Sequence, residues 1–316
     1  MSASRTGDCG DDIERSICPA MDSALTLIGL PVALGIIMLG LGLGLTVEDF
    51  RRVARHPKAA VIALGCQVLL LPALCFGLVL AFGLAPELAL GMMLLAASPG
   101  GTTANLYSHL FGGHVALNIT LTAINSVLAV FTLPIVVNLS AVYFFADGMS
   151  LGLQFDKVVQ VFAIVLIPVA IGMLVRARVP HVALRLDRPV RALSVVVLVA
   201  VIVGAVLNER ENLADYFVSV GLAVLAFNVL SLAVGYGVPR FAGVDRAAAT
   251  ASGFEIGIHN STLAITVALS PALLDNTRMA VPAAVYGIVM LFTAVAFGVL
   301  VTRLGARSAE PAGQEP

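Results

Sequence analysis

The sequence predicts an all-α, polytopic membrane protein. Of its 316 residues, 59% are hydrophobic and 12% are charged, and the mean hydropathy is +1.00. The apolar residues gather in nine runs, most of them near the roughly 20 residues that a helix needs to cross about 30 Å of hydrocarbon. Because a backbone in lipid must satisfy its own hydrogen bonds, each run is expected to be a helix.

The nine expected transmembrane helices follow one another along the chain. They cover residues 24–46, 59–83, 88–111, 115–141, 158–175, 190–207, 216–238, 247–268 and 279–301. We predict one transmembrane domain at residues 24–302, a disordered tail at residues 1–23 and a second tail at residues 303–316. The first tail has neither a basic start nor an apolar segment, so no secretory signal is predicted there.

Lysine and arginine residues set the expected orientation. If the loops alternate between the two sides of the membrane, thirteen of these 18 residues fall on one side and five on the other. Positive residues are enriched in cytoplasmic loops, so the side with thirteen is expected to be cytoplasmic. This places the N-terminus outside and the C-terminus inside a multi-pass cell membrane protein, most simply in a bacterial plasma membrane.

The third expected helix is predicted to be broken at its centre. Residues 98–105 read SPGGTTAN within an apolar run. Pro99 removes a backbone donor and clashes with the preceding turn, and Gly100 and Gly101 weaken the helix further. A proline kink is the simpler account, but two threonines and Asn105 exceed what a kink requires, so we predict a functional site.

Glu255 in the eighth expected helix is the acidic residue that lies inside an apolar run. Residues 250–263 read TASGFEIGIHNSTL, so Gly253 and Gly257 flank the glutamate and His259 follows it. An intramembrane carboxylate costs roughly 2.5–3.5 kcal/mol on insertion scales and marks a functional site. We predict a second interrupted helix that presents its carbonyls and carboxylate to a cation. A structural hydrogen bond between Glu255 and His259, at i and i+4, is the alternative.

Further polar side chains lie in the second and fourth expected helices. Asn118, Thr122 and Asn125 recur at i, i+4 and i+7, on one face of an otherwise apolar helix. Such residues either hydrogen-bond neighbouring helices or supply oxygens to a cation. Gln67 stands alone in the second helix, where a packing role is the more common one. Two interrupted helices in a polytopic protein indicate a secondary transporter with a site near the membrane midplane.

The sequence lacks the motifs of metal centres and of intramembrane enzymes. Its four cysteines, at positions 9, 18, 66 and 75, have no metal-binding spacing, so no metal site is predicted from them. A disulfide between Cys9 and Cys18 is one option, and free thiols are the other. There is no HExxH or GxSxG motif and no second intramembrane carboxylate. An enzyme that uses Glu255 and His259 is therefore the weaker hypothesis, and no nucleic-acid partner is expected.

Four segments of the chain resemble the bile acid:sodium symporter family. They are HPKAAVIALGCQ at residues 56–67, SPGGTTAN at 98–105, GGHVALNITLT at 112–122 and FEIGIHNSTLA at 254–264. The resemblance implies a core domain in which the broken third and eighth helices cross, packed on a panel domain. It also implies an inverted-repeat architecture from which the first helix of the first repeat is missing, which gives the nine-helix form.

The resemblance implies two sodium sites. By position, the first would use Asn105, Asn118, Thr122 and Glu255, and the second would use Gln67, Glu255, His259 and the backbone carbonyls of Ile256 and Ile258. Ala104 stands where a serine is usual, and His259 stands where a glutamine is usual. Imidazole is a poor sodium ligand but a good proton carrier near neutral pH. One or two sodium ions are expected as coupling ions, with proton coupling through Glu255 and His259 as the alternative.

For the substrate, the two helix N-termini at the breaks would direct partial positive charge into the cavity, which favours a carboxylate or sulfonate. By similarity, the binding residues would be Gly101, Thr102, Thr103 and Asn260. We predict sodium-coupled symport of a bile-acid-like anion or a small carboxylate such as pantoate, by alternating access. The carrier is expected to be a monomer in contact with membrane lipid. An arsenite-type efflux permease is less favoured because no cysteine follows Cys75.

Overall fold

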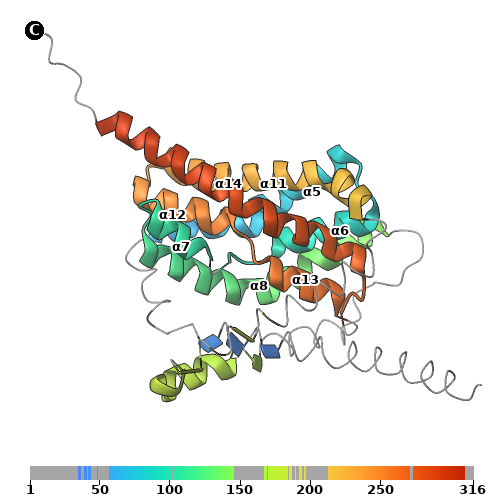
Figure 1. Ribbon diagram of the computed structural model, residues 1–316, viewed down its shortest axis with the longest axis horizontal. Coiled ribbons are helices and arrows are strands. Elements are labelled where there is room, and N and C mark those ends of the chain that lie inside the picture. Colours follow the sequence, from blue (N-terminus) through green and yellow to red (C-terminus); the bar gives the residue numbers. More distant parts are fainter. Residues whose placement is uncertain are drawn as a thin grey trace, which may run out of the picture.

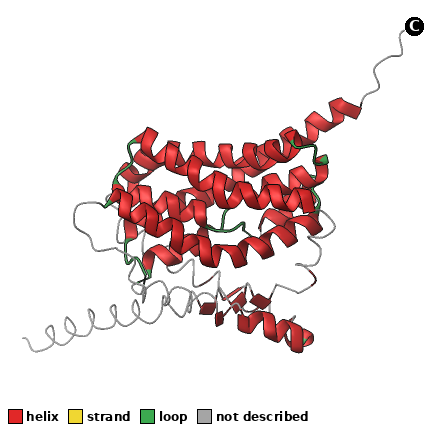
Figure 2. Ribbon diagram, turned by 180° about the vertical axis from the view of Figure 1, so that it is seen from behind, coloured by secondary structure: helices red, strands yellow, loops and turns green. Residues whose placement is uncertain are grey.

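The computed structural model describes residues 57–101, 103–145, 170–183, 213–270 and 273–309, together with isolated residues between 35 and 48 and between 167 and 196. Within these residues the regular structure is helical, and the long helices lie side by side (Figures 1 and 2). Six of the nine expected transmembrane helices can be followed. The expected helices at 24–46, 158–175 and 190–207 fall largely outside the described residues, as do the first tail and its two cysteines.

The second expected helix is formed by three consecutive elements. These are α4 (Pro57–Gly65), the π-helical turn η3 (Cys66–Leu70) and α5 (Leu71–Phe82). In η3 the amide of Leu71 donates to the carbonyl of Cys66, five residues back, so the helix widens there. Pro72 follows directly and has no amide to offer the preceding turn, which favours a local departure from α-helical bonding. Gly83 ends α5 in the left-handed conformation at a φ of 59°.

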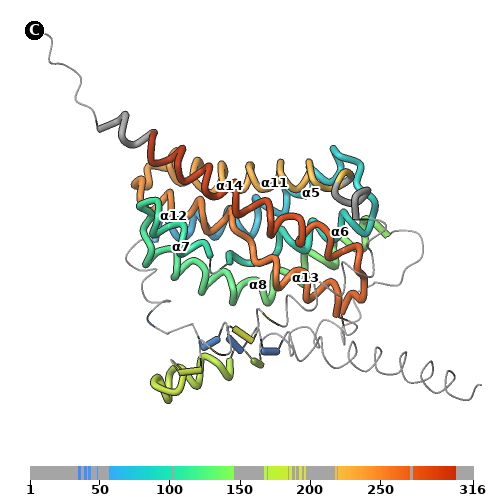
Figure 3. The backbone as a smooth tube through the Cα atoms, in the orientation of Figure 1, coloured from blue at the N-terminus to red at the C-terminus, as the bar shows by residue number. Residues whose placement is uncertain are grey.

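Neither of the two spans predicted to be interrupted is a continuous helix. The third consists of α6 (Pro86–Ala97) and α7 (Thr103–Leu110), and the eighth consists of α12 (Arg246–Gly257) and α13 (Ser261–Leu269). In Figure 3 these two interrupted spans run in opposite directions through the middle of the molecule. As a result α7 lies beside α12, and α13 lies beside α6.

The remaining long helices are α8 (Val115–Phe144), α11 (Leu213–Phe241) and α14 (Thr277–Ala309). Together with residues 57–82, these helices contain the four described segments that are long and apolar enough to cross a membrane. Their outward faces carry large apolar side chains, such as Leu139 of α8 and Phe292 of α14. An apolar outer surface is what a protein in contact with lipid requires. The chain is therefore a multi-pass membrane protein, and α14 continues seven residues beyond the predicted end of the transmembrane domain at 302.

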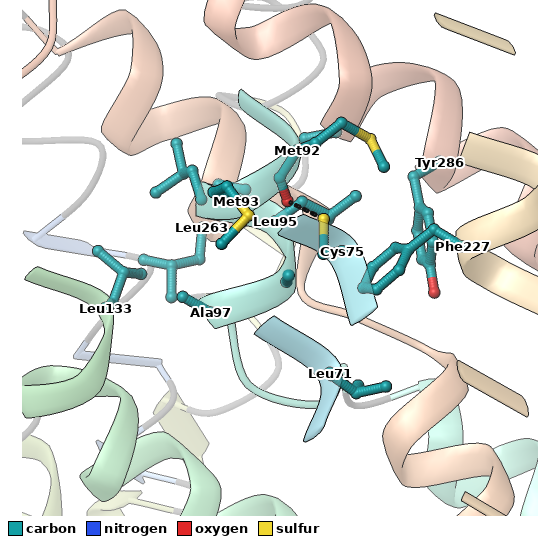
Figure 4. Packing of buried hydrophobic residues seen from close by; sticks show 14 of the residues in the cluster. Leu71, Cys75, Met92, Met93, Leu95, Ala97, Leu133, Phe227, Leu263 and Tyr286 are labelled. Atoms are coloured by element: carbon teal, nitrogen blue, oxygen red, sulfur yellow. Dashed lines mark hydrogen bonds between the residues drawn. The ribbon is translucent and has the colours of Figure 1, made fainter. Parts of the chain in front are cut away.

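The main core lies around α6, in which every residue from Leu88 to Ala97 is buried. Figure 4 shows Met92 and Leu95 of this helix among Leu71 and Cys75 of α5, with Phe227 and Tyr286 close by. The thiol of Cys75 donates to the carbonyl of Met92 at 3.4 Å. This packing fixes the end of α6 where the break begins.

Candidate functional site

The two interrupted spans meet at their breaks. An isolated antiparallel bridge pairs Gly100 with His259. The amide of Gly101 donates to the carbonyl of Ile258 at 2.6 Å, and the amide of Asn260 donates to the carbonyl of Pro99 at 2.8 Å. Each break therefore satisfies backbone groups that the other has removed from its own helix, as a buried backbone requires. The bridge gathers the ends of four half-helices at one place.

Glu255 lies in the last turn of α12, next to this bridge, and its side chain is completely buried. Its carboxylate accepts hydrogen bonds from the hydroxyl of Thr122 at 2.5 Å and from the side-chain amide of Asn125 at 3.1 Å. Among the residues that the structure describes, no basic side chain pairs with it. A buried carboxylate with two neutral donors lacks a compensating charge, so a bound cation would offset its desolvation.

Gly100 allows the other break to approach this carboxylate. A Cβ atom placed on Gly100 would collide with the carboxylate group of Glu255 and lie 2.8 Å from its backbone oxygen. The absence of a side chain therefore brings the two breaks into contact. The sequence suggested Gly100 as a helix breaker, and the structure adds close contact as a second reason for glycine here.

The polar face of α8 meets both broken spans. Asn118 is completely buried, and its side-chain amide donates to Ser108 Oγ of α7 at 2.5 Å and to the carbonyl of Ala251 of α12 at 3.0 Å. These bonds leave Asn118 Oδ1 free to lie 3.5 Å from the hydroxyl of Thr122. One face of α8 thus joins α7 to α12 and directs the Thr122 hydroxyl and the Asn125 amide nitrogen toward Glu255. Ser108 has this role although the sequence offered no signal that separates it from an ordinary core serine.

Asn105 is half-buried on α7, and its Oδ1 atom has no hydrogen-bond partner. The residue before it, Ala104, offers its carbonyl to Asn118 Nδ2 at 3.4 Å. Of the residues predicted for the first sodium site, Asn118, Thr122 and Glu255 are directly hydrogen-bonded to one another in a chain. Asn105 follows Ala104, whose carbonyl bonds Asn118, and its own Oδ1 is unpartnered.

Gln67 and His259 hold the same carbonyl group from two sides. The carbonyl of Ser98 accepts from Gln67 Nε2 at 3.0 Å and contacts His259 Nδ1 at 3.2 Å. Because a carbonyl only accepts, we assign the hydrogen of the neutral imidazole to Nδ1. The structural hydrogen bond between Glu255 and His259 that the sequence allowed is not formed, since each side chain bonds other residues.

The other ring nitrogen of His259 lies in an aromatic setting. Nε2 is buried without a hydrogen-bond partner. The imidazole stacks on Phe227, with ring centroids 5.4 Å apart at 20°, and meets Tyr286 edge to face, also at 5.4 Å. Of these two rings only Tyr286 carries an oxygen, and its hydroxyl is engaged with the Gly257 carbonyl. The predicted role of His259 as a sodium ligand would therefore rest on Nε2 alone.

The carbonyls at the end of α12 are partly engaged. That of Ile258 accepts from Gly101 in the bridge, and that of Gly257 accepts from Asn228 Nδ2 at 3.0 Å and from the Tyr286 hydroxyl at 2.9 Å. Ile256 is buried one residue after Glu255. Asn228 of α11, which also bonds Thr293, was missed by the sequence reasoning. A lone asparagine in the seventh span was the signal available.

The residues predicted to bind the substrate are partly brought together. The amide of Gly101 and the backbone of Asn260 both belong to the bridge. Asn260 is half-buried, and its Oδ1 caps α13 by accepting from the amide of Leu263 at 3.0 Å. Thr103 is exposed at the first turn of α7, and Thr102 lies outside the described residues. Two helix N-termini therefore start close to the bridge.

A comparison with protein families agrees with this arrangement. The model of the family described as "Sodium Bile acid symporter family" matches residues 31–216, more than half of the chain. The matched region covers the break of the third span and the polar face of α8. It ends before α12, so the residues around Glu255 lie outside it.

Individual relatives extend the similarity to most of the chain. An uncharacterized sodium-dependent transporter, YocS, of Bacillus subtilis is 28% identical over 82% of this chain and 78% of its own length. The ileal sodium/bile acid cotransporter of Homo sapiens is 25% identical over 75% of this chain and 68% of its own. A protein of Oryza sativa subsp. japonica named "Probable sodium/metabolite cotransporter BASS2, chloroplastic" is 27% identical over 84% of this chain, which corresponds to 62% of that longer protein.

Proposed function

Since the chain belongs to the Sodium Bile acid symporter family, we propose that it is a secondary active transporter that carries an organic anion together with sodium. The family is one of transporters, which agrees with the expectation that the chain is not an enzyme. The observation that carries the proposal is the completely buried Glu255 carboxylate at the meeting point of two broken helices. Oxygen-bearing side chains surround it, and hard monovalent cations prefer oxygen.

The coupling ions would bind on the α8 side of the bridge. The first sodium site uses Asn105, Asn118, Thr122 and Glu255, and the second uses Gln67, Glu255, His259 and the carbonyls of Ile256 and Ile258. Hydrogen bonds among these residues and the unpartnered oxygens of Gln67 and Asn105 support this assignment. Sodium would neutralise the carboxylate and hold the two breaks in the arrangement that receives the anion.

The substrate would bind at the opposite ends of the same breaks. Gly101, Thr103 and Asn260 lie at or before the first turns of α7 and α13, where helix dipoles favour a negative group, and Thr102 is the fourth residue proposed for this site. A bile-acid-like anion or a small carboxylate such as pantoate fits this chemistry. If two sodium ions accompany one monoanion, one net charge crosses the membrane, which is worth about 2.3 kcal/mol per 100 mV.

The proposed architecture is a core domain with crossing helices α6–α7 and α12–α13, which moves against a panel domain to expose the site to each side in turn. The nine helices would form two inverted repeats, the first of which lacks its first helix. The transmembrane domain would cover residues 24–302, with an extracytoplasmic tail at 1–23 and a cytoplasmic tail at 303–316. We propose that the carrier acts as a monomer in a bacterial plasma membrane.

Proton coupling through Glu255 and His259 is the second candidate function. The specific observation in its favour is the buried Nε2 atom of His259, which has a free lone pair and no partner. In this version the imidazole would accept a proton in place of the second sodium ion. The two versions differ in the gradient that drives uptake.

The test is uptake of labelled organic anions into proteoliposomes, with sodium and pH gradients imposed separately. Sodium-driven uptake by the wild type and background uptake by Glu255→Gln are expected, because the variant removes the charge that the cation neutralises. The matched control is Glu87→Gln, which changes a carboxylate in the first turn of α6 away from the bridge. Intact sodium-driven uptake in Glu255→Gln would refute the proposal, and uptake that needs only a pH gradient would favour proton coupling.

A further inference from the structure

A small cavity lies between the widened turn η3 and helix α8, close to the break of the third span. Its volume is about 10 Å³, which is room for about one water-sized particle. Gln67, Pro99, Asn125 and Thr132 line it, and apolar side chains such as Leu128 complete the wall. Asn125 belongs to neither of the sodium sites proposed above.

Two residues of this wall each have a buried side-chain oxygen without a hydrogen-bond partner. Gln67 Nε2 donates to the carbonyl of Ser98, and Asn125 Nδ2 donates to Glu255. Both partners are acceptors, so the amide nitrogens must face them and the amide oxygens are left over. Gln67 is only 5% exposed and Asn125 only 2%, and neither Oε1 of the first nor Oδ1 of the second has a partner. Leaving a buried acceptor unsatisfied costs about 1–3 kcal/mol, so two in one cavity indicate a ligand.

The chemistry of the wall selects a cation. The two free atoms are acceptors, and Pro99 has no amide hydrogen to donate. Thr132 adds only one hydroxyl to this wall, so an anion would be repelled by the two oxygens and by the nearby Glu255 carboxylate. An apolar group would leave both oxygens unsatisfied, and a water molecule would satisfy them without neutralising that carboxylate. The Glu255 carboxylate, bonded to the other end of Asn125, adds negative charge nearby. Hard oxygen ligands and a space of this size fit a small monovalent cation.

We propose that Gln67 and Asn125 form a sodium subsite. In it Asn125 Oδ1 is a ligand in place of a nitrogen of His259, because imidazole nitrogen is a poor ligand for sodium. This inference rests on the proposed function and changes the ligand set of its second sodium site. The π-helical turn at Cys66–Leu70 contains Gln67, and such turns frequently occur at functional positions. His259 Nδ1 is engaged with the carbonyl of Ser98, so the histidine stabilises the break instead of binding sodium.

The test measures equilibrium binding of ²²Na⁺ to the purified full-length protein. Asn125→Ala and Gln67→Ala are each expected to lower the affinity for one of the bound sodium ions at least about tenfold. The double variant is expected to lower the affinity for that same ion at least as far as either single variant and to leave the other ion unaffected, because both residues serve one site. The control is Asn138→Ala, which removes another unpartnered oxygen from α8 that does not line the cavity. It should bind sodium as the wild type does.

Several outcomes would overturn the inference. Wild-type sodium binding in Asn125→Ala, with binding lost in Glu255→Gln, would reject the subsite and leave the proposed function intact. Complete loss of sodium in Asn125→Ala would make Asn125 a positioning residue of Glu255 instead. A wild type that binds no sodium would reject both proposals. The milder variant Asn125→Ser, checked by gel filtration and thermal unfolding, serves if the alanine variant does not fold. Its affinity for sodium should also fall, because the serine hydroxyl does not extend as far as the asparagine Oδ1.

Discussion

The two breaks that meet in this molecule arise in different ways. The break of the third span contains Pro99, Gly100 and Gly101, so its own residues disfavour a helix. The break of the eighth span consists of Ile258, His259 and Asn260, which could continue a helix. Hydrogen bonds from neighbouring helices to the Gly257 carbonyl, and hydrogen bonds to the third-span break, keep these residues out of a helix instead. One interruption is local in origin and the other depends on tertiary contacts.

The largest expected effect tests the contact between the two breaks. Gly100→Ala would push a methyl group into the Glu255 carboxylate. We expect about a hundredfold fall in sodium-driven uptake, since small misplacements at a binding site have effects of this order, and a loss of about 1–3 kcal/mol in stability. The control is Gly77→Ala on α5, where an added Cβ meets no atom within 4 Å. Equal behaviour of the two variants would mean that the breaks need not touch.

A smaller effect is expected where neighbouring helices hold the eighth-span break. Tyr286→Phe removes one of two donors to the Gly257 carbonyl and should cost about 1 kcal/mol of unfolding free energy. Adding Asn228→Ala leaves that carbonyl without its second donor and should cost about 1–3 kcal/mol more. Thermal unfolding in detergent measures both. Tyr107→Phe, which removes a hydroxyl bonded to the exposed carbonyl of Leu291, is the control and should change little.

The smallest effect concerns the cap of α13. Asn260→Ala removes the side-chain oxygen that accepts from Leu263 and should lower stability by about 1 kcal/mol. Asn260→Asp keeps a capping oxygen but adds a negative charge and removes the amide donor. It should restore the unfolding temperature without restoring anion uptake, if Asn260 also binds the substrate. Recovery of both properties would limit Asn260 to its capping role.

The same contrast explains which parts of the site could be predicted. Helix breakers and an intramembrane carboxylate are local signals. Pro99, Gly100 and Glu255 therefore identified the two interrupted spans from the sequence alone. The partners of Gly257 come from helices far away in the chain, and an asparagine such as Asn228 looks the same whether it bonds a carbonyl or merely packs. The direction of the His259 ring depends on Ser98, which no spacing rule relates to it. Sequence patterns therefore located the breaks but did not identify the side chains that stabilise them.

Gln67 illustrates the same limit within a single helix. A lone glutamine in an apolar span is typical of packing, and Pro72 five residues later predicts at most a kink. The structure instead contains a π-helical turn, and the glutamine in it donates to the carbonyl of Ser98. The sequence of this helix does not show which partner the glutamine side chain will find. That partner belongs to another span, so local pattern could not decide it.

The backbone bridge between Gly100 and His259 also has a mechanical consequence. Its two hydrogen bonds tie the third span to the eighth at the point where each has least stiffness of its own. Displacing one segment would therefore move the other with it, and the proposed cation and anion sites on either side would keep their separation. In the proposed cycle, coupling between sodium and the anion would then need no relay of side chains, because both sites belong to the same pair of hydrogen-bonded segments.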